Sequence, residues 1–179
     1  RTNTILLISC ALVLSLAAVP VEAVETMNIA YFTAWGIYGR AYPPSKVDVS
    51  KVTHVLYAFA NIRDGQCVLG DSYADVEKTF PGMTYMNKED MRPGNHNGNI
   101  GWFATPGKYA RAINPNLKFL ISIGGWSWSK AFSEVARTQA TREKFVNSCV
   151  QFMLDYNFDG IDVDWEFPVA GGLPDNVYH

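Results

Sequence analysis

The sequence is poor in cysteine, carries no excess of positive charge and contains no Asn-x-Ser/Thr sequon. With 15 Lys and Arg residues against 17 Asp and Glu residues, its formal net charge is −2, so it has no basic footprint for nucleic acid. Three cysteines in 179 residues do not make a disulfide framework. Without a sequon, N-glycosylation is not expected. The hydrophobic content of 48% excludes a disordered chain and indicates one globular domain with a sizeable core.

The N-terminal segment has the features of a targeting sequence. Arg1 precedes an apolar run over residues 5–19, and Val21 and Ala23 supply small residues at the −3 and −1 positions of a cleavage site. The run is short for a membrane span, which needs roughly 20 apolar residues. We therefore expect residues 1–23 to be a signal peptide and the mature protein to be secreted and extracellular, without membrane association. An uncleaved anchor is the alternative.

Cleavage at this site would remove one cysteine and leave two. The lost residue is Cys10, and the remaining pair is Cys67 and Cys149. Cys149 falls on the apolar face of a predicted helix, which favours a buried free thiol. A single bridge between the two cysteines, which an oxidising compartment would permit, is the alternative.

Apolar runs separated by polar segments and helical patterns indicate an α/β protein with parallel strands. The predicted strands span residues 28–35, 52–62, 118–123 and 159–166. Helices are predicted over residues 106–113 and from a cap at Thr138 or Thr141 to about residue 156. Residues 63–102 are rich in Gly, Asn and Asp, and we expect them to form a long loop. A loop of that length in a compact domain is usually functional or loosely ordered.

The acidic strand over residues 159–166 is the most informative part of the sequence. Side chains alternate between the two faces of a strand, so Asp162, Asp164 and Glu166 point to one side. The apolar or aromatic residues that alternate with them point to the other side, so both faces favour burial; they are Ile161, Val163, Trp165 and Phe167. Same-face Cα atoms lie about 6.6 Å apart, close enough for the carboxylates to repel and for at least one pKa to rise. A protonated acid beside an ionised neighbour is the arrangement that acid–base catalysis uses.

Metal binding and simple solvation are the two alternatives to catalysis for these carboxylates. An Asp-x-Asp-x-Glu pattern supplies oxygen ligands for Ca²⁺ or Mg²⁺, but the Gly and Glu spacing of an EF-hand loop is not met. A solvated acidic face is disfavoured by the apolar residues that flank each acid. Catalytic carboxylates are therefore preferred, and neither a metal ion nor a cofactor is expected.

The position of Glu166 favours a barrel over an open sheet. Functional groups of an α/β barrel gather at the carboxyl ends of its strands. Glu166 lies at such an end, and Ser122 and Trp126 lie at the corresponding end of the strand over residues 118–123. An open doubly wound sheet would carry a Gly-x-Gly-x-x-Gly turn after its first strand, and the sequence has none there. We therefore expect a barrel.

Two motifs resemble those of family 18 glycoside hydrolases, the chitinases. The segment DGIDVDWEFP at residues 159–168 matches the D-x-x-D-x-D-x-E signature, and SIGGW at residues 122–126 is similar to the S-x-G-G signature. The resemblance runs from about residue 28 to the end of the chain and includes the segments YFTAWGIYGR and DSYADVEKTFPG. It implies a (β/α)8 TIM barrel, which typically has about 250 residues. Residues 24–179 would then be the N-terminal portion of the catalytic barrel and cover about its first four strands.

The resemblance implies a retaining, substrate-assisted hydrolysis of β-1,4-linked N-acetylglucosamine polymers. Glu166 would be the general acid that protonates the glycosidic oxygen, and then the base for the incoming water. Asp164 would orient the substrate's 2-acetamido group and stabilise the positive charge of the oxazolinium intermediate. Asp162 would share a proton or a hydrogen bond with Asp164.

The same resemblance suggests roles for further residues. Tyr31 and Ser122 are similar to the family's hydrogen-bond partners of the inner aspartate, Trp126 to a sugar platform, and Phe59 to the floor of the site. Asp159 is expected to be structural. The residues expected to bind substrate are Tyr31, Phe59, Ser122, Gly124, Gly125 and Trp126.

The expected function is that of a secreted, monomeric chitinase acting on chitin or chitooligosaccharides, with no nucleic-acid partner. Two alternatives remain at this point. One is a chitinase-like lectin that binds without cleaving, although such proteins typically lose the acid that Glu166 supplies here. The other is an endo-β-N-acetylglucosaminidase. Because four strands cannot close a barrel, residues 24–179 alone are expected to be inactive.

Overall fold

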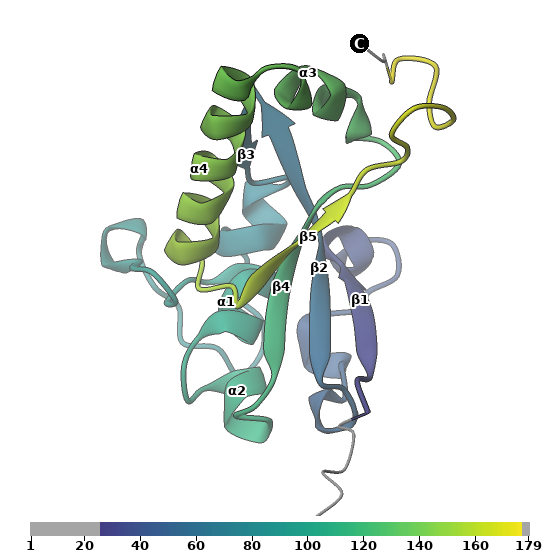
Figure 1. Ribbon diagram of the computed structural model, residues 1–179. Coiled ribbons are helices and arrows are strands. Elements are labelled where there is room, and N and C mark those ends of the chain that lie inside the picture. Colours follow the sequence, from purple (N-terminus) through teal and green to yellow (C-terminus); the bar gives the residue numbers. More distant parts are fainter. Residues whose placement is uncertain (1–25, 177–179) are drawn as a thin grey trace, which may run out of the picture.

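The computed structural model describes residues 26–176 and shows a mostly parallel sheet. Strands lie side by side in the order β1-β2-β4-β5, and β3 pairs with β2 alone (Figure 1). The strand bounds are β1 Ile29–Thr33, β2 His54–Arg63, β3 Gln66–Val68, β4 Lys118–Gly124 and β5 Gly160–Asp164. The predicted signal peptide, with Cys10, lies outside the described residues.

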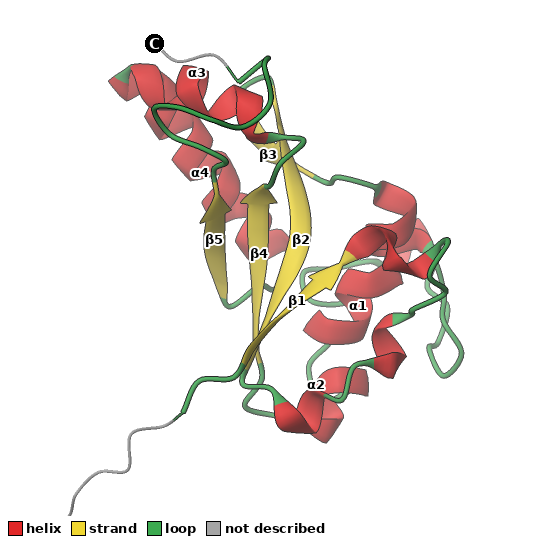
Figure 2. Ribbon diagram, turned by 90° about the vertical axis from the view of Figure 1, so that its right-hand side faces the viewer, coloured by secondary structure: helices red, strands yellow, loops and turns green. Residues whose placement is uncertain are grey.

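The predicted parallel strands are confirmed, with ends that differ by a few residues. The three pairs β1–β2, β2–β4 and β4–β5 are all parallel. Figure 2 shows the carboxyl ends of β4 and β5 at the same edge of the sheet. The order follows the sequence and does not reverse around the first strand, as the order of a doubly wound sheet does. This topology fits the first part of an α/β barrel.

The hydrophobic core is built on the centres of β2 and β4. Val55 and Tyr57 of β2 and Phe119 of β4 are at most 1% exposed. The Phe119 ring stacks on Phe103 at 5.0 Å and on Phe158 at 4.6 Å between centroids. These rings bring together a helix, a central strand and the turn before β5, so the base of the sheet is held rigidly below its carboxyl ends.

The apolar face of the acidic strand is buried only in part. Ile161 and Trp165 pack against the core. Val163 is 58% exposed and Phe167 is 45% exposed. The expectation that this whole face is buried is therefore wrong for Val163 and Phe167, because β5 pairs with β4 alone among the described strands.

The long loop expected over residues 63–102 is also wrong. The chain turns at Asp64 and Gly65, whose φ angles are +50° and +72°, and returns as β3 antiparallel to β2. A π-helical turn, a 3-10 turn and helix α1 follow. Their bounds are Tyr73–Glu77, Lys88–Asp90 and Gly98–Ala104.

Asparagines that would mark turns on a surface are buried in this segment. The side chain of Asn97 accepts from the Met86 N–H at 3.0 Å and donates to the Met86 carbonyl at 2.7 Å. The amide of Asn99, in α1, donates to the Ala34 carbonyl at 3.2 Å. These side chains form hydrogen bonds with backbone groups of Met86 and Ala34. A polar segment can therefore be ordered and buried.

The remaining helices follow the predictions in part. Helix α2, Tyr109–Ile113, is shorter than predicted, and α3, Phe132–Arg137, is a helix that was not predicted. Helix α4, Gln139–Asp155, begins after Thr138, whose Oγ1 accepts from the Thr141 N–H at 3.2 Å while Thr141 Oγ1 accepts from the Thr138 N–H at 3.1 Å. This reciprocal cap decides between the two candidate start residues. No helix within residues 26–176 is long and apolar enough to cross a bilayer.

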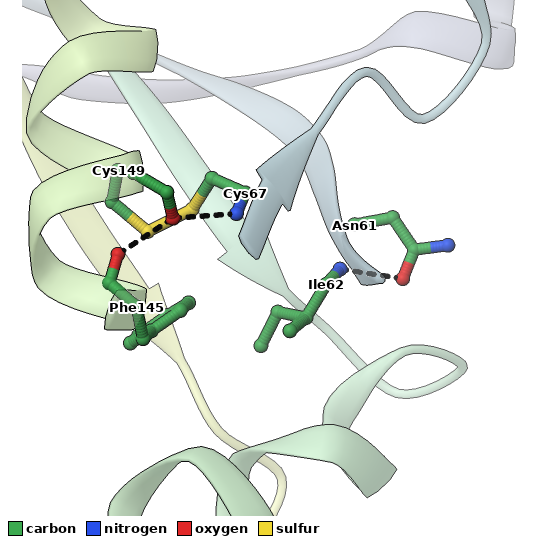
Figure 3. Close-up of a disulfide and its surroundings, with 6 residues drawn as sticks. Asn61, Ile62, Cys67, Phe145 and Cys149 are labelled. Atoms are coloured by element: carbon green, nitrogen blue, oxygen red, sulfur yellow. Dashed lines mark hydrogen bonds between the residues drawn. A yellow bond between two sulfur atoms is a disulfide. The ribbon is translucent and has the colours of Figure 1, made fainter. Parts of the chain in front are cut away.

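A disulfide joins Cys67 of β3 to Cys149 of α4, so the favoured free thiol is wrong (Figure 3). The burial of Cys149 on the apolar face of its helix is confirmed, at 4% exposed. Strand β3, which was not predicted, brings Cys67 against that face. The side-chain oxygen of Ser148 accepts from the Cys67 N–H at 3.0 Å and donates to the Phe145 carbonyl at 2.8 Å, so the β2–β3 hairpin is fastened to α4 twice.

Candidate active site

The candidate site lies at the carboxyl ends of β4 and β5. The parallel register sets Ser122 beside Asp162 and Gly124 beside Asp164. Glu166 follows two residues after the last residue of β5. Two of the three predicted catalytic carboxylates, Asp162 and Asp164, thus lie on β5, and Glu166 lies directly beyond its end.

Asp162 is the inner carboxylate and accepts two hydroxyl hydrogen bonds. Its Oδ2 atom lies 3.0 Å from the hydroxyl of Tyr31 and 2.7 Å from that of Ser122. Burial and the hydrogen bond to Asp162 raise the pKa of Tyr31 to about 12. Tyr31 therefore stays a hydrogen-bond donor at neutral pH. The predicted contacts of Tyr31 and Ser122 with Asp162 are present.

Asp164 is the carboxylate of the strand whose pKa is raised. Loss of solvent raises the pKa of its carboxyl, and the charges of Glu166 and Asp162 raise it further. The effect of like charges on one strand, which the alternation pattern predicted, therefore falls on the middle carboxylate.

A cleft of about 630 Å³ opens in front of these carboxylates. Its walls combine two acids with several aromatic rings. They are formed by Tyr31, Thr33, Trp35, Ala58, Phe59, Gly124, Trp126, Ser127, Trp128, Asp164 and Glu166. A second hollow of about 490 Å³ shares Trp35, Phe59 and Trp128 with it, so the depression continues past the first cleft. Flat rings around a polar centre suit sugar rings, which have apolar faces and hydroxyl edges.

The structure unites most of the predicted site in this cleft. Tyr31, Phe59, Gly124 and Trp126 line it together with Asp164 and Glu166. Asp162 and Ser122 are not among its lining residues, and Ser122 is fully buried. Gly125 packs against the ring of Phe59.

Trp35 and Trp128 also line the cleft, although the sequence interpretation selects only Trp126 among the tryptophans. The Trp35 ring stacks on Phe59 at 5.9 Å between centroids. The high aromatic content was the only signal for these two residues, and it does not separate cleft rings from core rings. Trp165 illustrates this, because it stacks on Phe132 in the core at 5.3 Å.

The two glycines of the second motif are required by close packing. Gly124 and Gly125 have φ angles of +103° and +71°. A Cβ atom on Gly124 would lie 2.5 Å from the Phe132 ring, and one on Gly125 would lie 2.6 Å from the Phe59 ring. Only glycine lets the chain turn here while Phe59 stays in the cleft.

Asp159 has the structural position expected for it. Its Oδ2 atom accepts from Arg111 and from the Phe119 N–H, each at 2.7 Å. These bonds connect α2 and β4 to the start of β5. Asp159 thereby holds the entry of the acidic strand, at the end of the strand opposite to Glu166.

Metal ligands are not grouped in the described part of the chain. Within residues 26–176, no three or more His, Cys, Asp or Glu side chains are placed together to hold a metal ion. The acids of β5 instead meet hydroxyl groups and the open cleft.

Comparison with known proteins decides the family. The sequence model described as "Glycosyl hydrolases family 18" matches residues 27–176. The chain belongs to this family. It is 40% identical to chitinase A1 of Niallia circulans, over 87% of the chain and 25% of that protein, and 42% identical to chitinase 1 of Aphanocladium album, over 84% of the chain and 34% of that protein.

A solved chitinase structure shows the same architecture. The structure of a chitinase from Bacillus thuringiensis superposes with a TM-score of 0.74 at 32% identity, covering 87% of this chain and 30% of that one. The sheet described above is therefore part of a (β/α)8 barrel. The chain spans about a quarter to a third of the length of the curated relatives that it matches.

Proposed function

We propose that the protein is a chitinase that hydrolyses β-1,4-linked N-acetylglucosamine polymers. The observation that carries the proposal is the row formed by Asp162, Asp164 and Glu166, of which Asp164 and Glu166 open into an aromatic cleft. The similarity to curated chitinases supports it. A binding protein would have no need for the acid at the end of the row, and Glu166 is present.

In this mechanism Glu166 is the general acid. It donates a proton to the glycosidic oxygen, and the carboxylate then accepts one from the incoming water. The nucleophile is the 2-acetamido oxygen of the substrate, because Asp164 rises from the same strand as Glu166 and is poorly placed to attack the opposite side of the sugar. Configuration is then retained.

Asp164 orients the acetamido group and stabilises the oxazolinium intermediate. Its raised pKa favours sharing a proton with its neighbours when the site is empty. As positive charge develops on the acetamido group, the ionised form of Asp164 is stabilised in turn. Asp162, held by Tyr31 and Ser122, is a fixed partner for this change.

The aromatic walls bind the sugar chain in this proposal. Trp126, half exposed at the edge of the cleft, is a platform beside the point of cleavage. Trp35 and Phe59 present stacked rings on the side toward the second hollow. A depression that runs past one sugar unit suits a polymer or oligosaccharide.

The setting of the enzyme is part of the proposal. Residues 1–23 act as a signal peptide, the mature protein is extracellular and monomeric, and neither a metal ion nor a cofactor takes part. Residues 24–179 form the N-terminal portion of the catalytic barrel and are inactive by themselves. Activity tests therefore use the complete protein, including any chain outside residues 1–179.

The deciding experiment is Glu166→Gln assayed on chitooligosaccharides. The substitution keeps the shape of the side chain and removes its proton, so turnover should fall about 10²–10⁴-fold while oligosaccharide binding persists. A variant that keeps more than about a tenth of the turnover would refute the role of Glu166. If the native protein cleaved N-glycans but not chitooligosaccharides, the substrate assignment would be wrong.

The substrate-assisted step has a separate test. Asp164→Asn should lower turnover, and a thiazoline analogue of the oxazolinium intermediate should inhibit the native protein strongly. If the analogue bound no better than N-acetylglucosamine, the acetamido group would not be the nucleophile.

A further inference from the structure

The backbone of Glu166 lies beyond the end of β5, where no neighbouring strand among the described residues accepts its N–H. The side-chain oxygen of Ser129 takes this place and accepts from the Glu166 N–H at 2.8 Å. Ser129 begins the 3-10 turn Ser129–Ala131 and is 1% exposed. The acceptor of this hydrogen bond is therefore removed from water, although Glu166 itself is partly exposed.

The same hydroxyl is itself held in place. Ser129 Oγ lies 2.8 Å from the Gly125 carbonyl and 3.2 Å from the Asp164 carbonyl, and its single proton can be donated to either. The Asp164 carbonyl also accepts from the Gly125 N–H at 2.8 Å. One buried hydroxyl thus connects the turn after β4 with the end of β5 and with the peptide of Glu166.

The carbonyl side of Glu166 has its own buried partner. The side-chain amide of Asn176 donates to the Glu166 carbonyl at 3.1 Å and to the Phe167 carbonyl at 3.3 Å. Asn176 is 5% exposed and closes a turn through its own N–H to the Leu173 carbonyl at 2.9 Å. A Cβ atom on Gly172 would lie 2.2 Å from the Glu166 carbonyl, so this turn packs tightly on the peptide.

We infer that Ser129 and Asn176 are positioning residues that aim the Glu166 carboxyl at the glycosidic oxygen by fixing its peptide from both sides. This inference rests on the proposed function. The Glu166 side chain lines an open cleft, and the positions of its backbone atoms set where the carboxyl can reach. A misplacement of about 1 Å in a catalytic group can cost on the order of 10²-fold in rate.

The test compares two substrates that differ in their need for an acid. Chitotetraose has a sugar leaving group that must be protonated, whereas the dinitrophenolate of a 2,4-dinitrophenyl chitobioside leaves without a proton. A misaimed acid slows only the first reaction, whereas a smaller folded fraction slows both equally. The quantity compared is kcat/KM, which covers the steps up to departure of the leaving group.

We expect Ser129→Ala and Asn176→Ala to lower kcat/KM for chitotetraose about tenfold to 10²-fold. For the dinitrophenyl substrate we expect less than about a threefold loss, because general acid catalysis contributes little there. Ser129→Thr keeps the hydroxyl and should restore part of the loss. If Ser129→Ala does not fold, Asn176→Ala tests the same peptide from the other side.

Ser148→Ala is the matched control. Its hydroxyl also accepts a backbone N–H, that of Cys67, and donates to a carbonyl, that of Phe145, but it does not line the cleft. It should lower thermal stability like Ser129→Ala and leave both kcat/KM values unchanged. Equal losses on both substrates in the Ser129 and Asn176 variants, or no loss on either, would overturn the inference. A native protein inactive on both substrates would instead refute the proposed function.

Discussion

Asp75 and Asp162 each accept a hydrogen bond from a tyrosine hydroxyl, and they differ in almost everything else. Asp75 lies in the segment between β3 and α1 and accepts from Tyr57 at 2.5 Å and from the Asp71 N–H at 3.0 Å. Asp162 lies on β5 and accepts from Tyr31 and Ser122. Asp75 is 1% exposed, whereas Asp162 stands next to residues that line an open cleft.

The difference in burial changes what each carboxyl does. Burial raises the pKa of Asp75 to about 6, with the negative charge of Asp71 adding to the effect and the bond from Tyr57 opposing it. Its oxygens serve the fold by completing the bonds of a tyrosine and of a backbone turn. One oxygen of Asp162 accepts hydrogen bonds from two hydroxyl groups. The negative charge of Asp162 also raises the pKa of Asp164. A tyrosine–aspartate hydrogen bond thus stabilises the fold when it is buried, as at Asp75, and can take part in catalysis when it borders a cleft, as at Asp162.

The largest expected effect is on stability. Asp75→Ala leaves the buried Tyr57 hydroxyl and the Asp71 N–H without their acceptor, at about 1–3 kcal/mol each, so the free energy of unfolding should fall by roughly 3 kcal/mol. Urea unfolding of the complete protein measures it. Asp90→Ala, at an exposed residue, is the control and should change stability by less than about 0.5 kcal/mol. Equal effects of the two substitutions would show that the buried carboxyl of Asp75 contributes no more to stability than an exposed one.

Between pH 4 and 7, the largest part of the pH dependence of stability should come from Asp75. Its pKa is raised from 3.8 to about 6 in the fold, so the stability it contributes is full below pH 3.8 and is lost as the pH rises through about 6. The loss is on the order of 3 kcal/mol. Unfolding measured at intervals between pH 4 and 7 should show this fall, and Asp75→Asn should remove most of it. An unchanged slope in the variant would assign the titration to another group.

Asp162→Asn should show the opposite profile to the Asp75 substitutions. It keeps an acceptor oxygen for Tyr31 and Ser122 but removes the charge that acts on Asp164. Turnover of chitooligosaccharides should fall roughly tenfold, which corresponds to about 1.4 kcal/mol. The free energy of unfolding should change by less than about 1 kcal/mol. A large stability loss with full activity per folded molecule would mean that Asp162 is structural as well.

The smallest expected effects come from the two tyrosines. Tyr31→Phe removes one of two hydroxyls from Asp162 and should reduce turnover about fivefold, equivalent to about 1 kcal/mol, with little change in stability. Tyr57→Phe removes a donor from buried Asp75 and should lower stability by about 1 kcal/mol with turnover unchanged. Steady-state kinetics and urea unfolding on both variants check the pair. If Tyr31→Phe altered only stability, the hydrogen bond between Tyr31 and Asp162 would be structural, like the one between Tyr57 and Asp75.

The sequence predicted the position and the partners of Asp162 but made no prediction for Asp75. The period of two along residues 159–166 places the carboxylates on one side. In the structure Asp164 and Glu166 line the cleft, and Asp162 contacts the hydroxyl of Tyr31, which lines it too. The contacts of Tyr31 and Ser122 with Asp162 came from the resemblance to the family and are present in the structure. Asp75 gave no such signal, because one aspartate in a polar segment has the same local pattern whether it is exposed or sealed.

Local patterns failed wherever a distant partner decided the outcome. The segment over residues 63–102 is polar, yet Asn97, Asn99 and Asp75 are buried against backbone groups and Tyr57. The Cys67–Cys149 bridge spans 82 residues, and it forms only because the unpredicted strand β3 pairs with β2 and faces α4. Hydrophobic periodicity carries no information on such pairings.

The sequence by itself determined the four parallel strand runs, a helix start at Thr138 or Thr141, the side of β5 that carries the acids, and the family. These depend on residues that are neighbours in the chain, whose alternation and capping bonds follow from backbone geometry alone. Only the tertiary structure decided which carboxyl is sealed, which tryptophans enter the cleft, and that Ser129, 37 residues away, holds the peptide of Glu166. Those outcomes depend on burial and on contacts between distant segments, which arise only when the sheet brings the segments together.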